Sequence, residues 1–166
     1  ELSRFDDEYQ REVLKIAEIS AGTPAALKQW QKVYKKSTGH EQADILSMLA
    51  KANRNDSFVE SMLMPALSSS NESTRIAAAS QIGSYKNKKF TPALVDYLLK
   101  ASSDTELAAA KDAILQVADK DTDALLAQKV ETAQSKNKVA LLQLLAARRA
   151  VSQFDVVAKQ TASSDA

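Results

Sequence analysis

Apolar residues along this chain recur every three or four positions, in segments separated by short polar stretches. The first segment places its apolar residues on one helical face, at Phe5, Tyr9, Val13, Ile16 and Ala17. The second segment does the same with Leu27, Trp30, Val33 and Tyr34. Residues three and four apart lie on the same side of an α-helix, so both segments are predicted to be amphipathic helices.

The residues between segments are typical of helix ends. Ala21-Gly22 stops the first helix, and Thr23-Pro24 supplies an N-cap and a proline at the start of the second. The same pattern predicts five pairs of helices, near residues 4–36, 40–69, 71–102, 104–133 and 135–162. Pro65 is discordant, because proline inside a helix lacks the N–H and clashes with the preceding turn. A kink or an early break is therefore predicted at Pro65.

The pairs also repeat one another in sequence. Phe58-x₄-Leu63-x₃-Leu67 returns 32 positions later as Phe90-x₄-Val95-x₃-Leu99. The run Arg75–Ala79 returns after 31 positions as Glu106–Ala110. A period of this length with two helices per unit is the signature of stacked helical hairpins. The predicted fold is all-α, an α-α superhelix (solenoid) of about five helix pairs, forming one domain over residues 1–166.

The unit resembles a HEAT or HEAT-like (armadillo-type) repeat. That family's pattern is a polar start, an Arg near the fourth position, an Ala-rich first helix ending near Gly, and a second helix that opens near Pro and carries paired leucines. It is matched best by Asn71–Ala79, Ile82-Gly83 and Pro92–Leu99. The fourth and fifth units depart from it, since Ile114 and Ala146 replace the Gly. The resemblance implies a surface for protein, peptide or sister-domain contacts.

The last residues copy an earlier repeat start, since Ala162–Asp165 repeats Ala101–Asp104. The array is therefore expected to continue, with this chain a fragment of a longer protein. The Lys-, Ser-, Asn- and Ala-rich style is similar to helical repeat regions that precede a glycoside-hydrolase domain in secreted proteins of Bacteroidetes. That resemblance implies a periplasmic or secreted location, and glycan contact only through a catalytic domain outside this chain.

Composition narrows the class of protein further. Hydrophobic residues make up 45% and charged residues 26%, which excludes wholesale disorder, and Gly and Pro number 3 each, which favours helices. No cysteine is present, and no apolar run reaches the length of a membrane span.

Charge changes sign along the array. Residues 71–103 contain five basic and two acidic side chains, residues 104–134 three basic and seven acidic, and residues 135–166 five basic and two acidic. This alternation does not form the continuous basic stripe that binds phosphate groups, so a nucleic-acid partner is disfavoured.

Few residues suggest chemistry. Asp119-x-Asp121-x-Asp123 has the opening spacing of a calcium loop, but Ala124 and Val130 stand where that loop needs Gly and Glu. The predicted role of these carboxylates is to cap the following helix. No catalytic, cofactor-binding or metal-binding residue is predicted, and the chain itself is not expected to be an enzyme.

Three further groups have ordinary interpretations. His40 has no second His at metal-ligand spacing and is predicted to be a surface residue at a helix start. Arg148-Arg149, near Lys136 and Lys138, is predicted to be a solvated helix end. Trp30 and Tyr34 share the spacing of Leu27 and are predicted to pack in the core.

A partner is expected on the outward side of the second helices. If Leu94, Val95, Leu98 and Leu99 are buried, helical geometry turns Asp96, Tyr97 and Lys100 outward. Carrying this phase through the repeat gives a predicted contact row, at Met64, Asp96, Tyr97, Lys100, Gln128, Glu131 and Lys159. Its mixture of aromatic, thioether and charged groups is closer to a protein-binding patch than to a phosphate groove.

Overall fold

The computed structural model describes residues 7–117 and 119–162, and these form helices joined by short links. The α-helices are α1 (Asp7–Ala21), α2 (Pro24–Lys36), α3 (Gly39–Ala52), α4 (Asp56–Phe58), α5 (Met64–Ala66), α6 (Glu72–Ser84), α7 (Thr91–Lys100), α8 (Asp104–Gln116), α9 (Lys120–Thr132), α10 (Ser135–Ala147) and α11 (Phe154–Ala162). A π-helical turn, η2 (Val59–Leu63), and two 3₁₀ turns, η3 (Lys88–Phe90) and η4 (Val151–Gln153), complete the described part. The predicted all-α fold is confirmed.

The chain divides into two compact units, residues 1–85 and residues 86–166. The division falls within the third predicted pair, after α6 and before α7. The prediction of a single domain over residues 1–166 remains a prediction.

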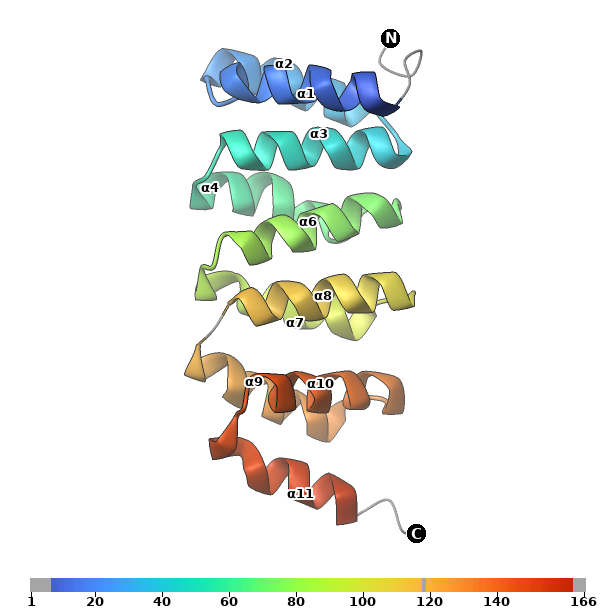
Figure 1. The fold of residues 1–166 in the computed structure, drawn as a ribbon, viewed down its shortest axis with the longest axis vertical. Coiled ribbons are helices and arrows are strands. Elements are labelled where there is room, and N and C mark those ends of the chain that lie inside the picture. The colour runs from blue at the N-terminus through green and yellow to red at the C-terminus, as the bar shows by residue number, and fades with distance from the viewer. Residues whose placement is uncertain (1–6, 118, 163–166) are drawn as a thin grey trace. The chain divides into compact units, whose positions relative to one another are not determined.

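In unit 1 (residues 1–85) the first helix of each repeat packs against the first helix of the next. Figure 1 shows α1, α3 and α6, coloured blue to green, following one another, and α3 contacts both of the others. The centre of this unit is α3, where Ile45, Leu46 and Leu49 are fully buried. These residues lie one and three positions apart, so they form one broad apolar face that neighbours cover on both sides.

In unit 2 (residues 86–166) the second helices of the repeats, α7, α9 and α11, alternate along the chain with the first helices, α8 and α10. Helix α7 contacts α8 and α9, and α10 contacts α8 and α9 (Figure 1). The largest fully buried side chains are Leu94, Leu98, Ile114, Leu126, Leu141, Leu144 and Leu145. Helix α11, by contrast, has no buried residue among those whose side chains are described.

The repeat period is visible in the caps of the second helical segments. Thr23, Asn55, Asn87 and Asp119 follow one another at intervals of 32, and each is an N-cap whose side chain accepts a backbone N–H. These residue types satisfy the free N–H groups of a first helical turn. The same local chemistry therefore restarts a helical segment at the same point of four successive repeats.

The irregularity predicted at Pro65 is present as a π-helical turn. The N–H of Met64 bonds to the carbonyl of Val59, five residues back, and helix α5 ends one residue after the proline. A proline has no N–H and crowds the carbonyl four residues before it. Widening the turn by one residue removes that crowding, and such π-turns are a recognised cause of bends in helices.

Candidate interaction surface

Most of the predicted contact row is accessible to a partner. Asp96, Lys100, Gln128 and Glu131 are exposed in unit 2, as is Lys159, while Met64 in unit 1 is half-buried. The carboxylate of Asp96 lies 3.7 Å from the Lys129 ammonium. Binding by these residues stays a prediction.

The outward orientation predicted for Tyr97 is wrong. Its side chain is 5% exposed, and its hydroxyl donates to the Glu106 carboxylate at 3.3 Å. Helix α7 is covered by both α8 and α9, so its buried arc is wider than a leucine stripe alone predicts. Leu99, predicted to be buried, is half-buried instead. The phenol can be buried because its hydroxyl has a partner.

Glu106 is a buried carboxylate that closes the link before α8. It is 1% exposed and accepts hydrogen bonds from the Ser102 backbone N–H at 2.8 Å and the Ser102 hydroxyl at 2.6 Å. Ser103, the N-cap of α8, accepts from the Glu106 N–H. This reciprocal arrangement resembles a capping box and accounts for the burial of the charge as helix-end structure.

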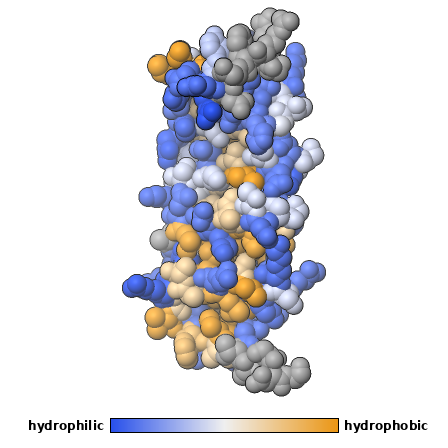
Figure 2. All heavy atoms as spheres, turned by 45° about the vertical axis from the view of Figure 1, so that its right-hand side comes forward, coloured by the Kyte–Doolittle hydropathy of each residue, from blue (hydrophilic) through white to orange (hydrophobic). Residues whose placement is uncertain are grey.

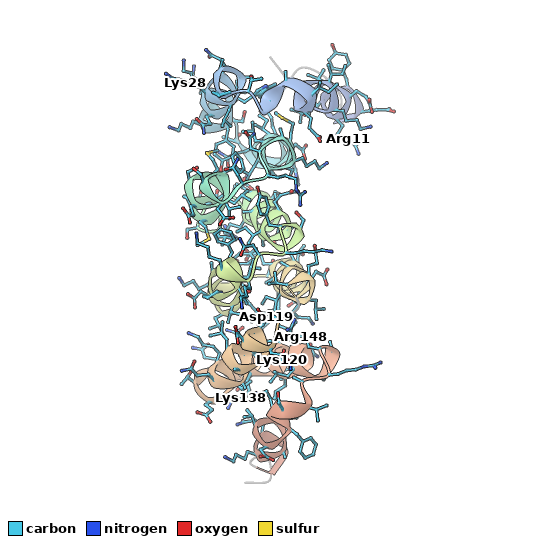
Figure 3. The ribbon with its side chains drawn as sticks, turned by 90° about the vertical axis from the view of Figure 1, so that its left-hand side faces the viewer. Arg11, Lys28, Asp119, Lys120, Lys138 and Arg148 are labelled. Atoms are coloured by element: carbon cyan, nitrogen blue, oxygen red, sulfur yellow. The ribbon has the colours of Figure 1, made fainter. Side chains whose placement is uncertain are left out.

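The prediction that Arg148-Arg149 is a solvated helix end is wrong for Arg148. Its side chain is 7% exposed, and Nε donates to the Asp123 carboxylate, whose side chain is 14% exposed. The other guanidinium nitrogens donate to the carbonyls of Val117, at 3.2 Å, and Asp119, at 2.6 Å. Figure 3 shows Arg148 beside Asp119. The planar donor fork of arginine thus ties α10 to the start of α9.

The three aspartates of the calcium-like spacing all have protein partners. Asp119 caps α9, Asp123 pairs with Arg148, and Lys88 lies 3.2 Å from Asp121 and 3.4 Å from Asp119. The hydrogen bond from the Asp121 backbone N–H, together with Lys88, holds the pKa of Asp119 below its usual value against the effect of burial. The hydrogen bonds to Asp121 and Asp119 raise the pKa of Lys88. The capping role predicted for the aspartates is confirmed for Asp119.

Unit 1 contains the remaining predicted groups. His40 is exposed at the start of α3, as predicted. Trp30 and Tyr34 are half-buried on α2, a helix without fully buried residues, so their packing is less complete than the core position predicted for them.

Side chains at the ends of the first helices link successive repeats, which the sequence analysis missed. Asn53, the C-cap of α3, donates to the Ala21 carbonyl at 3.2 Å, 32 residues earlier. Tyr85, the C-cap of α6, donates from its hydroxyl to the Asn53 carbonyl at 2.9 Å, again 32 residues earlier. Arg148, the C-cap of α10, reaches Val117 in the same way, 31 residues earlier. The signal was the polar residue that recurs after 32 positions at Asn53 and Tyr85, although the corresponding C-cap of α8 is Val117.

A cavity of about 370 Å³ lies in unit 2 at the beginnings of α7 and α9. Its buried walls are Thr91 and Thr122, at 3% and 2% exposure, and its apolar walls include Pro92 and Leu125. Lys88 and Asp121 stand at its exposed rim, together with Lys89 and Asp119. Among the described residues, the Thr91 hydroxyl is the buried side-chain polar group that has no hydrogen-bond partner.

Three large apolar side chains are exposed in the last part of unit 2. Val139, Val151 and Phe154 are 54%, 82% and 68% exposed, on α10, η4 and α11. Figure 2 shows hydrophobic atoms in this lower part of the molecule. Exposed apolar residues that stand singly are common on protein surfaces, so these three by themselves mark no interface.

Within the two described ranges, no group of three or more His, Cys, Asp or Glu residues could hold a metal ion. Nor does any helix of those ranges have the length and apolar character needed to cross a membrane. The helices and their packing against neighbours define an all-α protein with a repeat-like arrangement of helices. Comparison with known proteins adds no family, since no family model, curated protein or solved structure matches the chain.

Proposed function

We propose that this chain is a HEAT-like interaction module, without catalytic activity of its own, that binds a protein or peptide. The proposal depends on one observation, the accessible mixed-charge row on the second helices of unit 2. Asp96 and Lys100 on α7 and Gln128 and Glu131 on α9 are all exposed, and α7 and α9 are in contact. Stacked repeats present such continuous surfaces and use them for binding.

The chemistry of this row fits a protein partner better than a nucleic acid. The row carries both signs of charge, on Asp96, Lys100 and Glu131, and Lys129 lies 3.7 Å from Asp96 beside it. Phosphate backbones need a surface of one positive sign, whereas protein partners accept interspersed charges at the rim of an interface.

Two matched variants test the proposal. The surface variant carries Asp96→Ala, Lys100→Ala, Gln128→Ala and Glu131→Ala. The control variant carries Thr105→Ala, Asp112→Ala, Gln116→Ala and Arg149→Ala, all exposed positions beyond the row. Each is immobilised and used to capture proteins from an extract of the source organism, with quantification by mass spectrometry.

The expected result is one partner that is lost at least tenfold by the surface variant and retained by the control variant. Circular dichroism confirms that both remain helical. Equal capture by the two variants, or capture of the same nucleic acid by both, contradicts the proposal.

The link to glycoside hydrolases of secreted Bacteroidetes proteins depends only on a composition rich in Lys, Ser, Asn and Ala. Reading the parent gene on both sides of residues 1–166 tests it directly. A hydrolase domain in the same reading frame supports the accessory role, and a reading frame without one removes it.

A further inference from the structure

Helix α2 in unit 1 carries a row of lysines along one side. These residues, here called the lysine stripe, are Lys28, Lys32, Lys35 and Lys36, and the helix contains no acidic residue. All four are exposed, and none of them forms an ion pair with a residue of the described ranges. Positions three, four and seven apart share one side of an α-helix, so the stripe presents its ammonium groups in the same direction.

The stability of α2 does not explain the stripe. Lys28 and Lys32 stand four residues apart, as do Lys32 and Lys36, and like charges at this spacing destabilise a helix. Lys35 and Lys36 lie in the last turn, where cations complement the helix dipole, but Lys28 and Lys32 precede that turn. Unpaired charges of one sign at this spacing are suited to attract a partner of the opposite sign.

The opposite side of α2 is occupied by unit 1 itself. Leu27, Trp30 and Tyr34 are half-buried there, and α2 contacts α1 and α3. Figure 3 shows Lys28 across unit 1 from Arg11 of α1. Helices that lie on a membrane surface insert an apolar face among the lipids, whereas α2 uses its apolar face for packing. An acidic protein therefore fits α2 better than an anionic lipid surface does.

The stripe is too short for a nucleic-acid strand. From Lys28 to Lys36 it covers about 12 Å along the helix axis. The corresponding segment of the next repeat, residues 56–66, contains Asp56 and Glu60 and no basic residue. A phosphate backbone needs a positive surface that continues along the strand. A length of about 12 Å instead matches about four residues of an extended peptide.

The neighbours and the spacing of the stripe also suit a peptide. Gln29 and Gln31 flank it, and amide side chains both donate and accept hydrogen bonds, as the main chain of a peptide does. Lys28 and Lys32 are separated by about 6 Å along the axis. Alternate side chains of an extended peptide are separated by about 6.6 Å, which is close to that spacing.

We propose that the lysine stripe binds an extended acidic segment of a protein partner, with acidic side chains at alternate positions against Lys28, Lys32 and Lys35. Lys32 stands 32 residues before Met64 and 64 before Asp96, so the stripe is the first-repeat counterpart of the predicted contact row. The proposal rests on the proposed function, to which it adds the chemistry of the partner.

The test uses two peptides that differ only in charge. N-acetyl-(Glu-Gly)₅-amide and N-acetyl-(Gln-Gly)₅-amide are titrated separately into the ¹⁵N-labelled chain at low salt, and amide chemical shifts are followed. The expected result is saturable shifts confined to residues 23–38, with the glutamate peptide alone. The affinity is expected to fall as NaCl is added, because the lysines are exposed to solvent.

Two variants with the same loss of charge assign the binding to the stripe. The stripe variant carries Lys28→Gln, Lys32→Gln and Lys35→Gln. The control variant carries Lys51→Gln, Lys86→Gln and Lys120→Gln, at exposed lysines outside α2. Glutamine forms helices about as well as lysine, so both variants are expected to keep the circular dichroism of wild type. The stripe variant is expected to bind the glutamate peptide about tenfold more weakly, the combined worth of three exposed ion pairs, and the control variant to bind it as wild type does.

Hexathymidylate and vesicles that contain phosphatidylserine test other anionic partners under the same conditions. Three outcomes overturn the proposal. They are no saturable shift at low salt, equal weakening of both variants, and tighter binding of hexathymidylate or of the vesicles than of the glutamate peptide. If one of these occurs while the surface variant still loses its captured partner, only the stripe assignment falls and the interaction role stands. If the glutamate peptide binds through the stripe but the surface variant keeps its partners, the contact row on α7 and α9 falls and the stripe stands.

Discussion

The two units fill the same position of the repeat with different chemistry. In unit 1 the C-caps of α3 and α6 are Asn53 and Tyr85, neutral side chains that donate to carbonyls of the preceding repeat. In unit 2 the C-cap of α10 is Arg148, whose charge is largely buried against Asp123. Unit 1 also has a charged donor, since Arg54 reaches the Ser84 carbonyl, but at an exposed site.

This difference follows the charge pattern of the sequence. Residues 104–134 hold seven acidic side chains, and residues 135–166 hold five basic ones. In unit 2 the opposite charges meet across the repeats, in the pairs Lys136–Asp104 and Arg148–Asp123. The alternation that disfavours nucleic-acid binding therefore brings opposite charges together between repeats, and we expect exposed pairs such as Lys136–Asp104 to weaken as salt is added.

Removing Arg148 is expected to have the largest effect. Arg148→Ala leaves the Asp123 carboxylate partly buried without its cation and frees two carbonyls, which is expected to cost about 3–5 kcal/mol of unfolding free energy. Urea denaturation followed by circular dichroism measures it. Arg149→Ala, at the exposed neighbouring position, is the control and is expected to change stability by less than about 0.5 kcal/mol. Equal losses of unfolding free energy for the two substitutions would show that the hydrogen bonds of Arg148 do not stabilise the fold.

Asn53→Ala is the corresponding change in unit 1. It removes the bonds to the carbonyls of Ala21 and Leu49, and a loss of about 1–3 kcal/mol is expected. Because the donor is neutral, the loss is expected to be the same at low and at high NaCl concentration. A loss of stability that becomes smaller as salt is added would contradict the conclusion that the link in unit 1 depends on a neutral donor.

Tyr85→Phe removes a single hydrogen bond from the same series. The ring and its contact with the Arg54 guanidinium, 5.3 Å from the ring centre, are kept, so the cost is expected to be about 1 kcal/mol. Hydrogen exchange of the amides in α3 and α6 is expected to rise in parallel. Unchanged exchange and an unchanged urea midpoint would mean that the hydroxyl contributes nothing.

The pair Lys129–Asp96 sharpens the comparison at an exposed site. Side-chain exposures of 35% and 58% and a distance of 3.7 Å predict a coupling of only about 0.2–1 kcal/mol. A double-mutant cycle with Lys129→Ala and Asp96→Ala measures the coupling, which is expected to vanish in high salt. A larger coupling that persists in salt would show that the surface charges of unit 2 act as a network.

The smallest effect at neutral pH is expected from Asp119→Asn. Asparagine caps helices as well as aspartate does, so stability at pH 7 should change little. The pKa of Asp119 is lowered in the folded chain, so its stabilising contribution is present above about pH 4 and is lost as the pH falls through the folded value. Wild type is therefore expected to lose more stability than the variant between pH 5 and strongly acidic pH, as measured by urea midpoints. If the urea midpoints of wild type and variant fall in the same way with decreasing pH, the lowered pKa of Asp119 does not contribute to stability.

Much of the fold was predictable because it depends on local chemistry. Thr23 and Asp119 cap helices through their own nearby backbone, and Pro65 distorts the turn that contains it. The exposure of Asp96 and Lys100 was predictable, because helical phase alone decides the side of the helix on which they lie. The same prediction failed at Tyr97, because the width of a buried arc depends on how many neighbours cover the helix.

The sequence by itself determined where the helices begin, end and repeat, since these depend on residues a few positions apart. The tertiary structure decided which side chains are buried. Phe58, Phe90 and Phe154 occupy the same place in the repeat at intervals of 32 or 64, yet the first two are 3% exposed and the last is 68% exposed. The Arg148 side chain is buried only because the Asp123 carboxylate and two backbone carbonyls accept its hydrogen bonds. Burial and pairing depend on groups distant in the chain, and a local pattern cannot specify how those groups meet.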